Sequence, residues 1–125
     1  TLFRSSKTVL IVEDSGSFRM VVKIGLERAG YQVIEAADGE QACALLDGQA
    51  IHLVICDLNM PVMDGLTFVR YMRTTAYEFT PVIMLTTESQ EQKKAEGLEI
   101  GIRAWVTKPF QPSQLIDAVQ KVCPH

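Results

Sequence analysis

The sequence has few cysteines, no long apolar run and no excess of positive charge, and each absence disfavours a class of protein. Its three cysteines, Cys43, Cys56 and Cys123, are odd in number and lack CxxC or other metal-ligand spacing. This disfavours a disulfide framework and a zinc site, and it indicates a reducing, cytoplasmic setting. The apolar run at 9–12 is too short for a signal sequence or a membrane span. A net charge of -3 disfavours direct binding to nucleic acid.

Short apolar runs alternate in this chain with longer segments of helical period. With 125 residues, 47% of them hydrophobic, the chain fits one domain, 1–125, in which residues 1–7 form a short N-terminal extension. The runs are rich in Val and Ile and predict strands at 8–12, 32–35, 52–56, 82–85 and 104–107. The segments between them predict helices between Ser15 and Gly30 and at 40–46, 66–72, 90–99 and 112–122. This βα order predicts an α/β fold with a doubly wound parallel sheet.

The first predicted helix has clear signals at both ends. Ser15 can cap its start, and Gly30 suits the left-handed position just past its end. Its predicted apolar stripe consists of Phe18, Val21, Val22 and Leu26.

Polar side chains follow four of the five predicted strands. Glu13 and Asp14 follow the first, Asp57 the third, Thr86 the fourth and Lys108 the fifth. Because an open parallel sheet binds its ligands beyond the carboxyl ends of its strands, we expect these groups to converge on one rim.

Three clustered carboxylates repel one another unless a cation offsets their charge, so a divalent metal is expected at this rim. Oxygen ligands with room for water suit Mg²⁺, for which Mn²⁺ is a substitute. Beside the metal and the ammonium of Lys108, the carboxylate of Asp57 could attack phosphorus in line. The irregular loop at 58–65 leaves Asp57 accessible. The residues therefore predict a domain that is phosphorylated on Asp57.

With these residues in place, the chain resembles the receiver domain of bacterial response regulators, most closely the single-domain chemotaxis regulators of the CheY type. The resemblance covers nearly the whole chain and rests on Glu13-Asp14, Asp57 in DLNMPVMDG, Thr86 and Lys108-Pro109-Phe110. It implies a flavodoxin-like (βα)5 fold with strand order 2-1-3-4-5 and a cis Lys108-Pro109 bond. It also implies that a sensor histidine kinase supplies the phosphoryl group.

The resemblance further implies roles for single residues. Asp14, Asp57 and the backbone carbonyl of Asn59 would bind the metal, and Glu13 would do so through water. Thr86 and Lys108 would contact the phosphoryl oxygens.

The resemblance also addresses signal output. Trp105 occupies the position of the switch aromatic, where relatives usually have Tyr or Phe, and its bulkier indole is expected to hinder inward rotation when Thr86 moves. Asn59 and Glu88 occupy the two variable positions that govern acyl phosphate hydrolysis in relatives. The output partner, which in a motility pathway would be the flagellar motor, is expected on the face of the fourth helix, fifth strand and fifth helix of a monomer or weak dimer.

Three alternatives stay open. The chain could be a receiver cut from a larger DNA-binding regulator or hybrid kinase. An aspartate-nucleophile phosphatase would need a second Asp two residues after Asp57, where the chain has Asn59, and a cap for which there is little room. A flavin or nucleotide carrier would need a glycine-rich loop, for which Ser15-Gly16-Ser17 is a weak candidate. We expect a switch that catalyses only its own phosphorylation and dephosphorylation.

Overall fold

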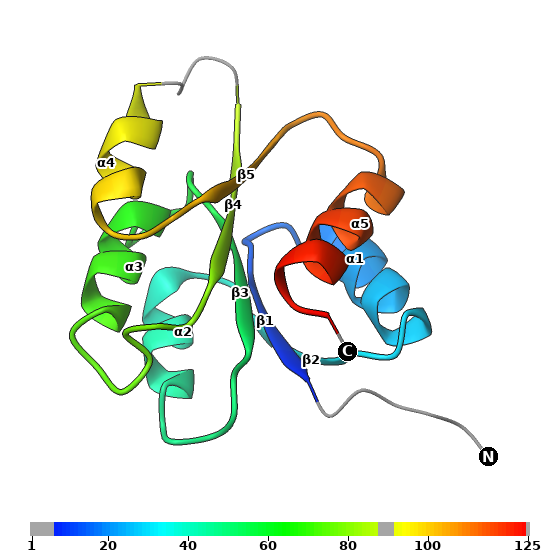
Figure 1. The fold of residues 1–125 in the computed structure, drawn as a ribbon, viewed down its shortest axis with the longest axis horizontal. Helices are drawn as coiled ribbons and strands as arrows, with labels where there is room; N and C mark the ends of the chain where they lie inside the picture. Colours follow the sequence, from blue (N-terminus) through cyan, green and yellow to red (C-terminus); the bar gives the residue numbers. More distant parts are fainter. Residues whose placement is uncertain (1–6, 88–91, 125) are drawn as a thin grey trace.

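The computed structural model describes residues 7–87 and 92–124, in which strands and helices alternate along the chain (Figure 1). The strands are β1 (Thr8–Val12), β2 (Gln32–Ala36), β3 (Leu53–Asp57), β4 (Val82–Thr86) and β5 (Ala104–Thr107). The helices are α1 (Gly16–Arg28), α2 (Gly39–Leu45), α3 (Gly65–Met72), α4 (Lys93–Glu99) and α5 (Pro112–Val122). The predicted βα order is therefore confirmed.

The five strands form one parallel sheet in the order β2-β1-β3-β4-β5, which confirms the flavodoxin-like topology. The register sets which strand ends lie side by side. Val12 pairs with Ala36 on one side and with Cys56 on the other, and Asp57 pairs with Leu85. The residues that follow β1 and β3 are therefore neighbours at one edge of the sheet.

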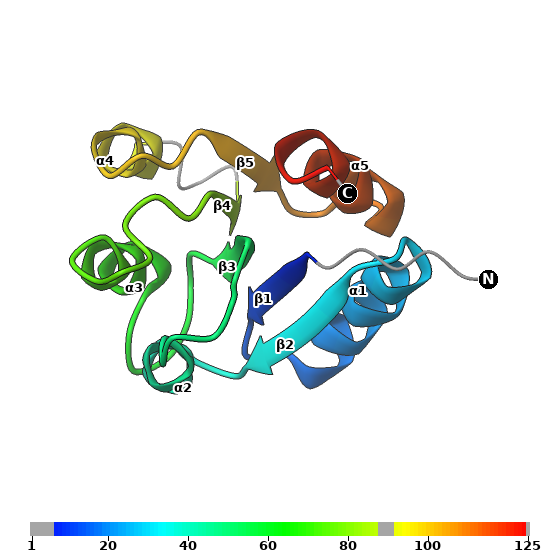
Figure 2. The same ribbon diagram turned by 60° about the horizontal axis from the view of Figure 1, so that its bottom comes forward.

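Helices cover both faces of the sheet, and Figure 2 shows α1 and α5 on one side and α2, α3 and α4 on the other. Side chains of β1 alternate between these two layers: Val9 and Ile11 face α1 and α5, whereas Leu10 and Val12 face the opposite helices. This is the period of two that a strand buried on both faces requires. Cys56 of β3 lies in the same layer as the α3 residues Leu66 and Phe68.

Several predicted boundaries and contacts are corrected. β3 begins at Leu53, and His52 instead precedes it and accepts a hydrogen bond on Nδ1 from the backbone N–H of Thr8 at 2.9 Å. Val21 is wrong as a core residue of α1 because its side chain is 50% exposed. Successive helical residues are 100° apart, so when Val22 is buried the adjacent Val21 points toward solvent.

Helix α4 begins at Lys93, and the predicted start at 90–91 lies outside the described residues.

Local signals at the helix ends agree with the structure. The Ser15 hydroxyl accepts a hydrogen bond from the N–H of Phe18 at 3.3 Å, and Gly30 has the positive φ of 97° that favours glycine. All three cysteines are free. None of the helices in the described part of the chain combines the length and apolar character needed to cross a bilayer.

A carboxylate and lysine cluster at the end of the sheet

Three carboxylates meet where β1 and β3 end. Glu13 and Asp14 follow β1, and Asp57 is the last residue of β3. Carboxylate oxygens of all three lie within 4.8 Å of one another. The side chains of Glu13 and Asp57 are almost fully buried, whereas Asp14 is exposed. The predicted convergence of these residues is present, although more than forty positions separate Asp57 from the acidic pair.

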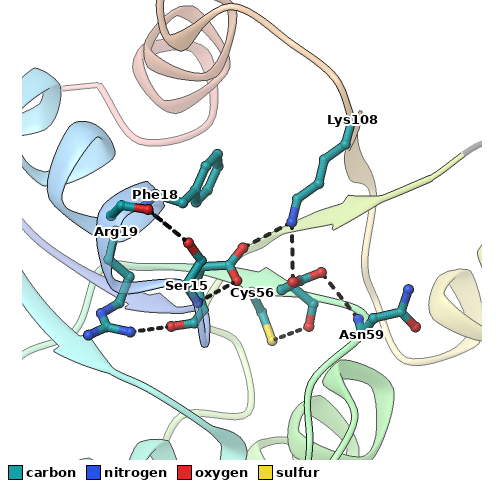
Figure 3. A network of polar contacts seen from close by, with 9 residues as sticks. Ser15, Phe18, Arg19, Cys56, Asn59 and Lys108 are labelled. Atoms are coloured by element: carbon teal, nitrogen blue, oxygen red, sulfur yellow. Dashed lines mark hydrogen bonds and ion pairs between the residues drawn. The ribbon is translucent and has the colours of Figure 1, made fainter.

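Lys108 reaches this cluster from the residue after β5. Its Nζ lies 3.0 Å from Glu13 Oε1 and 3.2 Å from Asp57 Oδ2, and Figure 3 shows the side chain extended toward both contacts. The backbone N–H of Lys108 donates to the carbonyl of Thr86 at 2.7 Å, which ties the ends of β4 and β5 together. The peptide bond from Lys108 to Pro109 is cis, as the resemblance implied. One ammonium therefore offsets part of the charge of three carboxylates.

The charges in the cluster change one another's protonation. The pKa of Asp14 is raised, first because its carboxyl shares a hydrogen bond with Glu13 and then because of partial desolvation and the charge of Glu13. For Lys108, burial is the largest single effect and lowers the pKa. The hydrogen bond that Lys108 donates to Glu13 and the charges of Asp57 and Glu13 outweigh this effect, so the pKa is raised overall and Lys108 keeps its charge.

The loop after β3 shapes the surroundings of Asp57. The backbone N–H of Asn59 donates to Asp57 Oδ1 at 3.2 Å, so one carboxylate oxygen faces Asn59 and the other faces Lys108 (Figure 3). Gly65 begins α3 and donates to the carbonyl of Leu58 at 2.9 Å. A Cβ at Gly65 would lie 2.5 Å from the carbonyl oxygen of Asp57. Only glycine allows α3 to approach β3 this closely.

The donor set fits a hard divalent cation. It consists of carboxylate oxygens from Glu13, Asp14 and Asp57, with no imidazole or thiolate among the clustered groups of the described residues. The thiol of Cys56 is excluded because burial raises its pKa well above the ordinary value and it lies in the core. Both oxygens of Glu13 are engaged, by Lys108 and by the backbone N–H of Ser15 at 3.1 Å. This agrees with a role for Glu13 through water.

A cavity of about 570 Å³ opens beside the cluster. Its walls are formed by Glu13, Ser15, Phe18, Thr87, Lys108, Pro109 and Phe110. The rings of Phe18 and Phe110 meet edge to face at 5.6 Å, and Lys108 Nζ lies 5.1 Å from the centre of the Phe18 ring. The cavity leaves the end of the sheet where Lys108 lies accessible to a small molecule.

The predicted switch residues Thr86 and Trp105 lie on β4 and β5. Thr86 is the last residue of β4 and is 1% exposed. Trp105 lies on β5, packs against the core on the α4 side and donates from Nε1 to the carbonyl of Ile102 at 3.3 Å. Glu88 lies outside the described residues. The expectation that the indole hinders the switch stays a prediction.

The indole of Trp105 lies against α4 because residue 97 is glycine. A Cβ at Gly97 would overlap Trp105 Cζ2 and lie 2.7 Å from Cη2. We therefore expect Gly97→Ala to displace the indole toward solvent. The overpacking destabilises the protein, whereas alanine favours a helix over glycine by about 1 kcal/mol. The free energy of unfolding is therefore expected to fall only slightly, by about 1 kcal/mol.

The chain contains one tryptophan, so its fluorescence reports this displacement directly. In Gly97→Ala the emission maximum is expected to shift to longer wavelength and quenching by acrylamide to increase. Leu98→Ala is the matched control, because Leu98 is the next residue of α4 and its side chain is 57% exposed. Emission from Gly97→Ala that equals the wild type would contradict the contact.

Arg19 is absent from the residues predicted for this site, yet it contacts the acidic pair. Its Nη1 donates to the backbone carbonyl of Glu13 at 2.6 Å, and its Nε donates to Glu35 Oε1 of β2 at 3.3 Å. No local sequence signal identifies such a residue, since a single arginine near a helix start is ordinary. Its contacts depend on β2 lying beside β1.

A flavodoxin-like sheet with clustered carboxylates and a lysine at its carboxyl end defines the receiver class of two-component signalling proteins. The model of the response regulator receiver domain family matches residues 9–120. The chain belongs to this family.

Similar proteins carry the domain in different settings. The structure of the chemotaxis response regulator CheY4 of Vibrio cholerae is 44% identical, with a TM-score of 0.87, and the match covers 94% of this chain and 99% of that one. The phosphate regulon transcriptional regulatory protein PhoB of Pseudomonas aeruginosa is 34% identical over 117 residues, which are 93% of this chain and 51% of PhoB. The chain thus spans about half the length of the curated relatives it matches.

A third relative includes a bound metal. The receiver domain of the sensor histidine kinase PA1611 from Pseudomonas aeruginosa is 28% identical, with a TM-score of 0.82 over 94% of this chain and 98% of that one. Its structure has a magnesium ion coordinated in the active site cleft.

Proposed function

We propose that this receiver accepts a phosphoryl group on Asp57 from a sensor histidine kinase, with Mg²⁺ bound by Asp14, Asp57 and the backbone carbonyl of Asn59. The meeting of three carboxylates with Lys108 at one end of the sheet carries the proposal. Mn²⁺, also a hard cation, is a substitute. The magnesium ion in the PA1611 receiver supports the choice of metal.

The chemistry assigns a task to each residue. A carboxylate oxygen of Asp57 attacks phosphorus, and the bond to the leaving group breaks, so that the leaving group takes the bonding electrons. Lys108, already 3.2 Å from Asp57 Oδ2, pairs with a phosphoryl oxygen, and the Thr86 hydroxyl donates to another. The metal, when bound, offsets the charge of the phosphoryl oxygens.

The product is an acyl phosphate that water hydrolyses at the same site. Asn59 and Glu88 are proposed to govern how fast this happens. The chain is then a switch and not an enzyme that turns over a metabolite. Hydrolysis of a generic phosphomonoester by the purified protein would instead favour the phosphatase alternative.

The output surface is proposed to be the face of α4, β5 and α5. Phosphorylation adds charge and acceptor oxygens near Thr86, whose carbonyl is bonded to the N–H of Lys108 beyond β5. Movement at the end of β4 therefore reaches β5, where Trp105 contacts α4. Trp105 is proposed to rotate to a limited extent when Thr86 moves.

Chemotaxis is the proposed pathway, with a motility partner such as the flagellar motor, a cytoplasmic location and a monomeric or weakly dimeric state. The similarity to CheY4 along nearly its whole length supports this choice. Similarity to PhoB and to the PA1611 kinase receiver supports the alternative, in which the domain is part of a longer regulator or hybrid kinase. The coding sequence beyond His125 and the neighbouring genes distinguish the two.

Removal of metal is expected to prevent phosphorylation. With Mg²⁺ and acetyl phosphate, the protein should gain one phosphoryl group, because the cation offsets the repulsion between the carboxylates and the incoming phosphate. With a chelator in place of Mg²⁺, the rate should fall at least about a hundredfold. Intact-protein mass spectrometry over time measures both rates. Phosphorylation that is equally fast with the chelator would refute the metal-dependent mechanism.

A further inference from the structure

Arg19 connects the edge strand of the sheet to the backbone of the acidic pair. Its Nε lies 3.3 Å from Glu35 Oε1 on β2, and its Nη1 donates to the Glu13 carbonyl at 2.6 Å. Glu13 in turn contacts Lys108, which contacts Asp57. Figure 3 shows Arg19 on the side of the cluster opposite Lys108. A continuous chain of polar contacts thus runs from β2 to the phosphoacceptor.

The position of Arg19 is not favoured by helix stability. It is the fourth residue of α1, at the end of the first turn, where the partial positive charge of the helix dipole disfavours a cation. That turn, which the structure describes in full, has no acidic residue to compensate. The side chain is nevertheless only 20% exposed. The contacts to Glu13 and Glu35 therefore offset a local electrostatic cost.

The backbone at Glu13 is held on two sides. Its N–H donates to the carbonyl of Ala36 at 3.1 Å, which extends the pairing of β1 with β2, and its carbonyl accepts from Arg19. Asp14 is the next residue, so its carboxylate is placed by the backbone that these two bonds hold. Without the second bond, repulsion among the three carboxylates would push the loop outward.

We propose that Arg19 is a positioning residue that holds the loop after β1 in the geometry that binds the divalent metal. The inference rests on the proposed metal site and deepens it. Residues that orient metal ligands typically contribute tenfold or more to metal affinity. Arg19 acts through Glu13 and Asp14, without contacting the metal or the phosphoryl group.

The test compares Arg19→Gln with Lys23→Gln. Lys23 lies one turn later on α1 and its Nζ is 3.5 Å from Glu35 Oε2, so both changes remove one positive charge beside the same carboxylate. Of these two side chains, only that of Arg19 hydrogen-bonds to Glu13. The dissociation constant of Mn²⁺ is measured by the electron paramagnetic resonance signal of the free ion, and that of Mg²⁺ by competition.

In Arg19→Gln, metal binding should weaken about tenfold, whereas Lys23→Gln should stay within about twofold of the wild type. At saturating Mg²⁺ the phosphorylation rate of Arg19→Gln should return to within about threefold of the wild type, because Asp57 and Lys108 are unchanged. Equal metal affinity in the two variants overturns the positioning role. Absence of metal binding by the wild type overturns the proposed metal site itself.

A second variant guards against misfolding. If Arg19→Gln unfolds at a clearly lower temperature than Lys23→Gln, Arg19→Lys is measured in its place. Lysine keeps the charge but lacks the planar fork that contacts Glu13 and Glu35 together. Its metal dissociation constant should rise about threefold, and a constant equal to that of the wild type overturns the inference.

Discussion

Asp57→Asn is expected to abolish phosphorylation by acetyl phosphate, with a loss of at least about a hundredfold in rate. The amide has nearly the same shape as the carboxylate but carries no negative charge, so its oxygen is a poor nucleophile. The substitution also removes one of the three carboxylates that could hold the metal. Intact-protein mass spectrometry in saturating Mg²⁺ measures the rate. Acquisition of one phosphoryl group by this variant would place the acceptor elsewhere.

Asp64→Asn is the matched control for this change. Asp64 belongs to the same loop, but its Oδ1 caps α3 by accepting from the N–H of Thr67 at 2.8 Å. Asparagine is as good a helix cap as aspartate, so the fold is expected to be unaffected. The control should be phosphorylated at the wild-type rate, which separates loss of the nucleophile from loss of any nearby charge.

Gly65→Ala is expected to lower the free energy of unfolding by about 2–3 kcal/mol. The new Cβ would lie 2.5 Å from the Asp57 carbonyl oxygen, 3.0 Å from Met84 Sδ and 3.1 Å from Leu58 Cα. Two of these atoms belong to the backbone and cannot rotate away. Either α3 moves outward or the end of β3 shifts, and both cost packing. Urea unfolding measures the loss.

The same substitution should slow phosphorylation of the folded protein about tenfold, since Asp57 is displaced from Lys108 and misplacement of a reacting group is costly. Gly16→Ala provides the comparison, because Gly16 is likewise the first residue of a helix and, among the described residues, its added Cβ would meet only Arg19 Nη2, at 3.7 Å. That variant should be at least as stable as the wild type. Equal stability of the two variants would contradict the close approach of α3.

The residues of the candidate site that lie at the ends of strands could be predicted from the sequence. Glu13, Asp14, Asp57 and Lys108 each follow an apolar run of strand length, and parallel strands bring their carboxyl ends to one edge. The sequence identifies Trp105 only through its place in the family pattern. Its contact with Gly97 depends on how α4 packs on β5, which no local pattern reports.

The errors and omissions of the sequence-based prediction also concern packing, which no local pattern reports. Val21 is as apolar as Val22, and a pattern of apolar residues cannot decide which of two neighbours faces the core. Gly65 reads as a turn signal after Asp64, whereas its necessity comes from the distance to the Asp57 carbonyl. Arg19 gains a role only because β2 pairs with β1 and brings Glu35 within 3.3 Å.

The order of strands and helices, the parallel sheet and the identity of the acidic and basic groups were determined by the sequence itself. Hydrophobic period and side-chain chemistry are local properties, so they can be read residue by residue. The tertiary structure decided which oxygens of Glu13 are engaged, how close α3 lies to Asp57, and that Arg19 supports the acidic pair. Those features depend on distances of a few ångströms between residues far apart in the chain, which only packing sets.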